Sequence, residues 1–221
     1  MRRLGSTLLI TALLIPISPA TGVESTTANS PANKSQYEAA LSSLNKLAVK
    51  GRAPKTGYSR DKFPHWRDPD RNGCDARNDT LKRDLTMVVF REGSDNCKVV
   101  AGKLLDPFSN KEIIFDLSQS SSNIDIDHLV ALSNAWQTGG FKLTTLQRTN
   151  FANDPLNLIA VDFRLNRQKG DGDAATWLPP YKSYRCTYVA RQVLVKEKYK
   201  LWVTPPEKAA ISKLLDSCLK D

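Results

Sequence analysis

Two stretches near the middle of the chain decide the fold, IDIDHLV at residues 124–130 and NLIAVDFRLNRQKGD at residues 157–171. The first alternates between apolar and polar residues, which is the period of a β-strand. The second starts within an apolar run over residues 156–161, typical of a short buried strand, and continues as a polar helix over residues 163–169. The sequence therefore predicts two strands followed by a helix, with an insertion at residues 131–156 between the strands.

An acid and a histidine stand side by side in the first stretch, as Asp127 and His128. In a strand their side chains point to opposite faces, so they cannot bind one ion from the same side. They can instead divide the work of phosphodiester hydrolysis. A histidine with a pKa of about 6.5 can accept the proton of a water molecule. The acid can hold a hard cation such as Mg²⁺, which keeps several waters, and Asn166 on the following helix can supply a second oxygen.

The order of these residues resembles the HNH, or ββα-metal, nuclease motif, in the variant with asparagine in the last place. From about residue 45 to Cys218 the chain is similar to small secreted HNH proteins related to the C-terminal domain of the GmrSD restriction endonucleases. The stretches that carry the resemblance are GYSRDKFPHW (57–66), CDAR (74–77), the segment from DH (127–128) to NAW (134–136), FAND (151–154) and WLPP (177–180).

The resemblance implies a role for each matching residue. His128 corresponds to the general base, Asp127 to the first metal ligand and Asn166 to the second. Asn157 corresponds to the asparagine that braces the loop between the strands and keeps the histidine oriented, so it is grouped with the catalytic residues. Many relatives carry a proline near the position of Ala131, and we expect a packing change there without loss of chemistry.

Several other charged residues are candidates for the site. Three cations on the predicted helix can contact substrate phosphates, or they form an ordinary solvated face: Arg164, Arg167 and Lys169. A second group either flanks the site or forms an ion network within the fold, and we favour the structural role: Arg60, Asp75 and Arg77. His65, beside Trp66, is also more typical of a structural histidine.

Residues 1–20 are typical of a secretory signal peptide. Arg2 and Arg3 precede an apolar run, and the small residues Ser18 and Ala20 follow it. The run is too short to span a bilayer, which needs about 20 apolar residues. We therefore predict a secreted protein with no membrane attachment after cleavage, and a disordered lead-in at residues 21–34.

The four cysteines are Cys74, Cys97, Cys186 and Cys218. Three disulfide pairings are possible, and the close spacing that zinc sites use is absent, so disulfides are the better prediction for an exported chain. Cys186 begins one predicted helix and Cys218 ends the next, and an antiparallel hairpin would bring those ends together. Cys74 and Cys97 bracket a helix and a strand in the same way.

The composition is that of one globular domain. The chain has 221 residues, of which 40% are hydrophobic, and this suits a single domain over residues 35–221 with its own core. Its net charge is +9, and a basic surface favours polyanions such as nucleic acid, although many secreted proteins are basic.

We expect an α+β fold: a ββα-metal (HNH) core, additional helices, and a small N-terminal antiparallel sheet, tied by disulfides. The sheet is predicted from strand-like runs at residues 86–90, 98–104 and 112–115. Further helices are predicted over 37–49, 79–84, 131–137, 144–151, 186–199 and 206–219.

The function that the resemblance implies is a secreted, monomeric endonuclease of low sequence specificity that uses Mg²⁺, or alternatively Mn²⁺. DNA is the favoured substrate over RNA. The alternative is a binding protein that kept the fold, lost catalysis and still binds polyanions. The simultaneous presence of Asp127, His128, Asn157 and Asn166 favours the enzyme, because a decayed site should have lost at least one of them.

Overall fold

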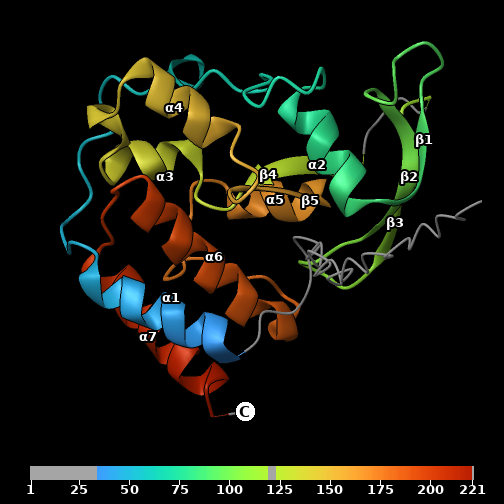
Figure 1. Ribbon diagram of the computed structural model, residues 1–221. Coiled ribbons are helices and arrows are strands. Elements are labelled where there is room, and N and C mark those ends of the chain that lie inside the picture. The colour runs from blue at the N-terminus through green and yellow to red at the C-terminus, as the bar shows by residue number, and fades with distance from the viewer. Residues whose placement is uncertain (1–33, 119–122, 221) are drawn as a thin grey trace, which may run out of the picture.

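The computed structural model describes residues 34–118 and 123–220. The predicted signal peptide and all but the last residue of the predicted lead-in lie outside this part of the chain. Helices and two small antiparallel sheets form a mixed α+β fold, as predicted (Figure 1). None of the helices in the described ranges combines the length and the apolar character needed to cross a membrane.

The elements follow the predicted order, with ends shifted by about one helical turn or less. The α-helices are α1 (Lys34–Lys46), α2 (Ala76–Asp84), α3 (Leu132–Gln137), α4 (Thr145–Ala152), α5 (Phe163–Lys169), α6 (Arg185–Lys198) and α7 (Pro205–Cys218). The strands are β1 (Thr86–Phe90), β2 (Val99–Leu105), β3 (Glu112–Asp116), β4 (Ile124–His128) and β5 (Leu158–Asp162). Short 3₁₀ turns occur at η1 (Arg60–Lys62), η2 (Gly140–Lys142) and η3 (Lys182–Tyr184).

Strands β4 and β5 form an antiparallel pair at the centre of the molecule. Their register places Asp127 opposite Ile159 and His128 opposite Leu158. Helix α5 follows β5 without a loop, because Asp162 ends the strand and its carboxylate caps the first turn of the helix. The predicted succession of strand, strand and helix is confirmed.

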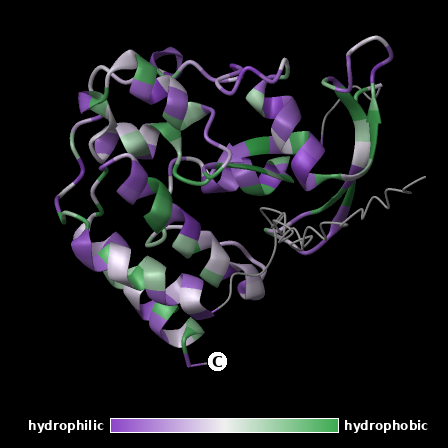
Figure 2. Cartoon of the chain, in the orientation of Figure 1, coloured by the Kyte–Doolittle hydropathy of each residue, from purple (hydrophilic) through white to green (hydrophobic). Residues whose placement is uncertain are grey.

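Both faces of this strand pair are covered. Ile159 and Val161 pack into the core formed with α1, α6 and α7. Leu158 and Ala160 pack into a second core with α2 and the sheet β1–β2–β3. Figure 1 shows the pair between these two groups, and in Figure 2 hydrophobic colours predominate in β5, whereas β4 alternates between hydrophobic and hydrophilic residues. The apolar side chains of the two strands are therefore buried in two cores, one on each face of the pair. The polar side chains lie towards α5 or at the ends of the strands.

Helix α2 is mostly hydrophilic, and polar contacts attach it to β5. The carboxylate of Asp84 accepts a hydrogen bond of 2.9 Å from the backbone N–H of Ala160. Arg83 donates to the carbonyl oxygen of Leu158 at 2.8 Å and forms an ion pair of 2.6 Å with Asp84. This edge of the central pair is therefore closed by side chains.

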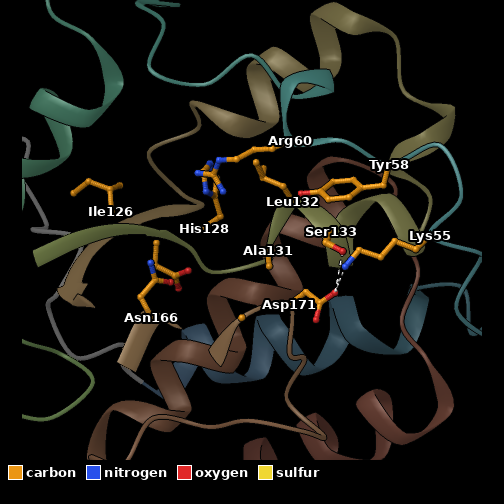
Figure 3. A pocket seen from close by; sticks show the side chains of 12 residues that line it. Lys55, Tyr58, Arg60, Ile126, His128, Ala131, Leu132, Ser133, Asn166 and Asp171 are labelled. Carbon is orange, nitrogen blue, oxygen red and sulfur yellow. Dashed lines mark hydrogen bonds and ion pairs between the residues drawn. The ribbon is translucent and has the colours of Figure 1, made fainter. Parts of the chain in front are cut away.

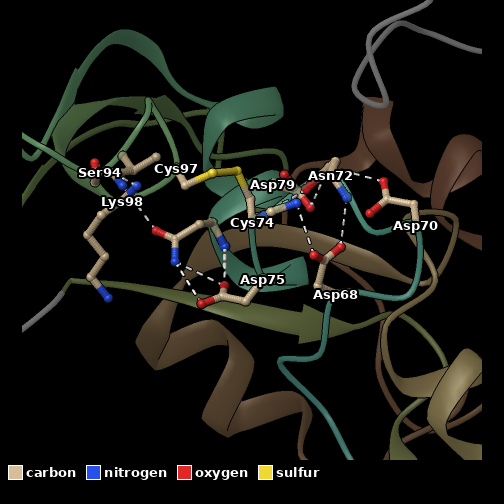
Figure 4. Close-up of a disulfide and its surroundings, with 12 residues drawn as sticks. Asp68, Asp70, Asn72, Cys74, Asp75, Asp79, Ser94, Cys97 and Lys98 are labelled. Atoms are coloured by element: carbon tan, nitrogen blue, oxygen red, sulfur yellow. Dashed lines mark hydrogen bonds between the residues drawn. A yellow bond between two sulfur atoms is a disulfide. The ribbon is translucent and has the colours of Figure 1, made fainter.

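Both predicted disulfides are confirmed, Cys74–Cys97 and Cys186–Cys218. The first joins the start of α2 to the segment before β2 (Figure 4). The second joins the start of α6 to the end of α7, the antiparallel arrangement that the sequence predicted. Cross-links of this kind stabilise a domain of this size by about 2–4 kcal/mol each.

An acidic loop precedes the first disulfide (Figure 4). The carboxylate of Asp68 accepts hydrogen bonds from the backbone N–H groups of Asn72 and Gly73, at 3.1 and 3.0 Å. The side-chain amide of Asn72 donates to Asp70 and Asp79 at 3.1 and 3.3 Å. These local bonds account for the loop conformation.

Candidate functional site

A cavity of about 440 Å³ opens beside the end of β4. Three segments distant in sequence line it: the loop before η1 and the first residue of η1 supply Lys55 and Arg60, β4 supplies Asp127 and His128, and α5 supplies Asn166. Figure 3 shows these segments around one hollow, with Asn166 and Lys55 on opposite sides. The cavity therefore brings together the predicted base and both predicted metal ligands.

Asp127 lies on the face of β4 that α5 covers, and it is only 4% exposed. Its Oδ1 accepts a hydrogen bond of 2.9 Å from the ammonium of Lys169. Its Oδ2 is buried and has no hydrogen-bond partner in the described part of the chain. Burial raises the pKa of the Asp127 carboxyl, and the Lys169 charge opposes this shift. A buried carboxylate oxygen without a donor is an energetic liability unless a cation or another donor binds it.

Asn166 lines the same cavity, and Asp125 orients its amide. The Nδ2 of Asn166 donates to Asp125 Oδ2 at 3.1 Å. A carboxylate only accepts hydrogen bonds, so the amide nitrogen must face Asp125 and the amide oxygen is left for another ligand. Asp125 was not among the site residues predicted from the sequence. Its spacing of two residues from Asp127 was the available signal, because both then lie on the strand face that meets α5.

These oxygens suit a hard cation that is held by few protein ligands. No group of three or more His, Cys, Asp or Glu side chains within residues 34–118 and 123–220 could hold a metal ion. Zinc sites use three or four such ligands, whereas Mg²⁺ takes one or two carboxylates and keeps its waters. The unpartnered oxygen of Asp127 and the amide oxygen of Asn166 belong to two residues that line the cavity, and they are ligands of the kind that Mg²⁺ takes.

His128 is held in one tautomer. Its Nε2 lies 2.9 Å from the carbonyl oxygen of Ala152, and a carbonyl only accepts, so Nε2 carries the proton and Nδ1 carries the lone pair. Trp66 stacks on the ring, with centroids 5.9 Å apart and planes inclined by 29°. Burial lowers the pKa of His128 to about 3, so the imidazole is uncharged at neutral pH and Nδ1 keeps its lone pair, while the same burial makes the ring a weaker base than a free imidazole.

Asn157 is fully buried and braces the chain around His128. Its Oδ1 accepts a hydrogen bond of 2.9 Å from the N–H of Val130, and its Nδ2 lies 3.5 Å from the carbonyl of Phe151. Phe151 directly precedes Ala152, whose carbonyl orients the histidine ring. The contacts are those expected of a bracing residue, and the role in catalysis stays a prediction. Phe151 and Ala152 both belong to the insertion at residues 131–156, so this insertion helps to hold His128 in place.

Lys169 differs from its predicted role. Its ammonium is buried and donates to Asp127 Oδ1 and to the carbonyl of His128, both at 2.9 Å. The expectation that it contacts substrate phosphates is therefore wrong, because the last turn of α5 crosses β4 and points this side chain inward. Arg164 and Arg167 are exposed, and their guanidinium groups lie 5.5 and 5.4 Å from the ring centroid of Phe163. Neither lines the cavity, and their contact with phosphate stays a prediction.

Arg60 also departs from the favoured structural role, because it lines the cavity. Figure 3 shows its side chain reaching towards His128, and its charge contributes to the lowered pKa of that histidine. Its guanidinium forms no ion pair or hydrogen bond with a described residue. Lys55 lines the same cavity but is paired with Asp171 at 3.3 Å. Arg60 is thus a cation of the cavity wall that remains available to an anionic ligand.

The remaining candidates have structural partners. The side chain of Asp75 caps α2. His65 Nδ1 lies 3.0 Å from the carbonyl oxygen of Phe63, and its ring packs against Trp66 with centroids 5.2 Å apart. Arg77 is half-buried, and burial lowers its pKa while the nearby carboxylates of Asp75 and Asp125 oppose the shift. The structural interpretation is confirmed for His65 and Asp75.

Comparison with known proteins gives two matches. The family model described as "GmrSD restriction endonucleases, C-terminal domain" matches residues 75–214. A relative from Arthroderma benhamiae, described as an uncharacterized secreted protein, is 41% identical over 190 residues, which is 85% of this chain and 89% of that protein. No solved structure matches the chain. The matched family range contains Asp127, His128, Asn157 and Asn166, whereas Arg60 precedes it.

Proposed function

We propose that this chain, which belongs to the family of the GmrSD restriction endonuclease C-terminal domain, is a secreted, divalent-metal-dependent endonuclease. Strands β4 and β5 and helix α5 would be its ββα-metal (HNH) core. One observation carries the proposal: a neutral imidazole with a free Nδ1 and an unpartnered carboxylate oxygen line the same cavity. Two disulfides and the secreted relative support export.

In this proposal the chain's own residues prepare a water molecule for attack on a phosphodiester. Nδ1 of His128 accepts the proton of that water, while Nε2–H stays on the carbonyl of Ala152. Trp66 stacks on the ring and so limits its rotation. A divalent cation held by Asp127 and Asn166, Mg²⁺ or Mn²⁺, would supply positive charge to the phosphate and the leaving oxygen.

Arg60 supplies the second positive charge of the proposed site. Its guanidinium has five N–H donors, whose geometry suits the oxygens of a phosphate. No described carboxylate forms an ion pair with it, so the guanidinium is available to the substrate. Nothing in the sequence resembles a helix-turn-helix or a zinc finger that reads bases, so we propose cleavage of low sequence specificity, with DNA as the favoured substrate.

The first prediction concerns metal removal. The purified mature protein should nick supercoiled plasmid with Mg²⁺ or Mn²⁺, stop when EDTA is added, and resume when Mg²⁺ is restored, because the phosphate charge is then stabilised again. Agarose gels of a time course provide the measurement. Nicking that continues at the same rate in metal-free buffer would contradict the proposal. If the protein instead binds the plasmid with an affinity that falls steeply with salt, and does not nick it, the polyanion-binding alternative would be favoured.

The second prediction concerns Arg60. Arg60→Met should lower the nicking rate by about 100-fold, as expected when a preorganised group that binds transition-state charge is removed. Mn²⁺ binding measured by calorimetry should be retained, because Arg60 contacts neither proposed ligand. Lys55→Met is the matched control, a cation of the same cavity already paired with Asp171, and should change the rate by less than about fivefold. Equal losses of nicking rate in both variants would show that Arg60 contributes only to the overall positive charge of the cavity.

A further inference from the structure

Lys169 is a buried cation inside the proposed site, and neither the resemblance nor the proposed reaction gives it a role. Its side chain is 0% exposed. The ammonium contacts both halves of the Asp127-His128 pair, through Oδ1 of the acid and the backbone carbonyl of the histidine. It stands one helical turn after Asn166, so the same helix carries the proposed second ligand and the residue that grips the first.

The ammonium makes the two oxygens of Asp127 unequal. Oδ1 is occupied at 2.9 Å, whereas Oδ2 has no partner in the described part of the chain. Rotation of the carboxylate would break a buried ion pair, which is strongly unfavourable. A cation chelated by both oxygens would also lie closer to the ammonium than a cation on Oδ2 alone, and like charges repel more strongly at shorter distance. The structure therefore leaves one oxygen of Asp127, a residue that lines the cavity, without a partner in the described part of the chain.

The number of oxygens offered by a carboxylate distinguishes the common divalent ions. Ca²⁺ takes six to eight oxygens and accepts two from one carboxylate, whereas Mg²⁺ is octahedral, takes few carboxylate oxygens and keeps its waters. Resting on the metal site proposed above, we infer that Lys169 is a positioning residue that holds Asp127 to one-oxygen coordination and so sets the preference of the site for Mg²⁺ and Mn²⁺ over Ca²⁺.

The test is calorimetric titration of MgCl₂ and of CaCl₂ into the wild-type chain and into Lys169→Met, without nucleic acid. Loss of one positive charge strengthens the binding of both ions, so the informative quantity is the ratio of the two dissociation constants. The ratio should shift towards Ca²⁺ by about tenfold in Lys169→Met, the lower end of the effect of a residue that orients a metal ligand.

Lys55→Met is the control for charge alone, because it removes a cation from the wall of the same cavity without touching Asp127. It should leave the ratio at the wild-type value. An unchanged ratio in Lys169→Met, with both ions still bound, would overturn the inference and leave the proposed enzyme intact. A wild-type chain that binds neither ion would instead overturn the proposed metal site, and the inference with it.

Replacing Lys169 leaves the Asp127 charge buried without its partner, so the variant can lose stability. A crystal structure of the wild-type chain with Ca²⁺ provides an independent measurement. We expect one Asp127 oxygen on the ion and the Lys169 ammonium still within hydrogen-bonding distance of the other. Coordination through both oxygens, or a Lys169 side chain displaced from Asp127, would overturn the inference.

Discussion

His128→Ala should lower the rate of plasmid nicking by about 1,000-fold, because a positioned general base contributes about 10²- to 10⁴-fold and no other described side chain offers a free imidazole nitrogen to the cavity. The ring is held by the carbonyl of Ala152 and by the face of Trp66. Its removal leaves both proposed metal ligands in place, so Mn²⁺ binding should persist. The measurement is the initial nicking rate at saturating Mn²⁺, with bound metal determined in the same samples.

His65→Ala is the matched control for this substitution. His65 is the other histidine of the chain, and its Nδ1 is engaged with the carbonyl of Phe63. It touches the same tryptophan that stacks on His128, so it also reports indirect effects through Trp66. We expect His65→Ala to retain most of the activity. Equal rates for wild type and His128→Ala would show that the base is a different group.

Asp127→Asn should weaken Mn²⁺ binding by about 100-fold or more and reduce nicking in proportion, since loss of a ligand should exceed the loss of a residue that merely orients one. Asparagine keeps the volume of the side chain and keeps an oxygen that can accept from Lys169. The substitution therefore removes the negative charge while it preserves the packing. Calorimetry and nicking assays on the same preparation provide the measurement.

Asp171→Asn is the control for Asp127→Asn. Asp171 lines the same cavity, but its Oδ2 already accepts from Ser133 at 2.9 Å and from Lys55 at 3.3 Å. Burial acts to raise the pKa of Asp171, and these hydrogen bonds outweigh it and lower the pKa. The carboxylate is thus satisfied within the chain, and its substitution should leave Mn²⁺ affinity near the wild-type value. Equal losses of metal affinity in both variants would remove the special role of Asp127.

The sequence was sufficient for the order of the elements and for the disulfides. The alternation in residues 124–130 and the polar helix before Gly170 depend on local periods, which the chain displays directly. The pairing of Cys186 with Cys218 followed from two consecutive helices, since a short connection makes them antiparallel. These features need only local information and one assumption about neighbouring elements.

The contacts of the site required the tertiary structure. Helix α5 is short and polar, so no apolar stripe indicated that Lys169, rather than an arginine, faces β4. Arg60 begins the short 3₁₀ turn η1, which is too brief for a period in the sequence to predict the direction of its side chain. The tautomer of His128 depends on the carbonyl of Ala152, which lies 24 residues away along the chain. Long-range contacts of this kind leave no local pattern in a single sequence.

The metal site can be tested with the anomalous difference map of a crystal soaked in Mn²⁺. We expect a single strong peak in the cavity, within coordination distance of Asp127 Oδ2 and of the amide oxygen of Asn166, with Nδ1 of His128 facing the same space. A peak at the acidic loop of Asp68 and Asp70, with none at Asp127, would rule out the proposed metal site.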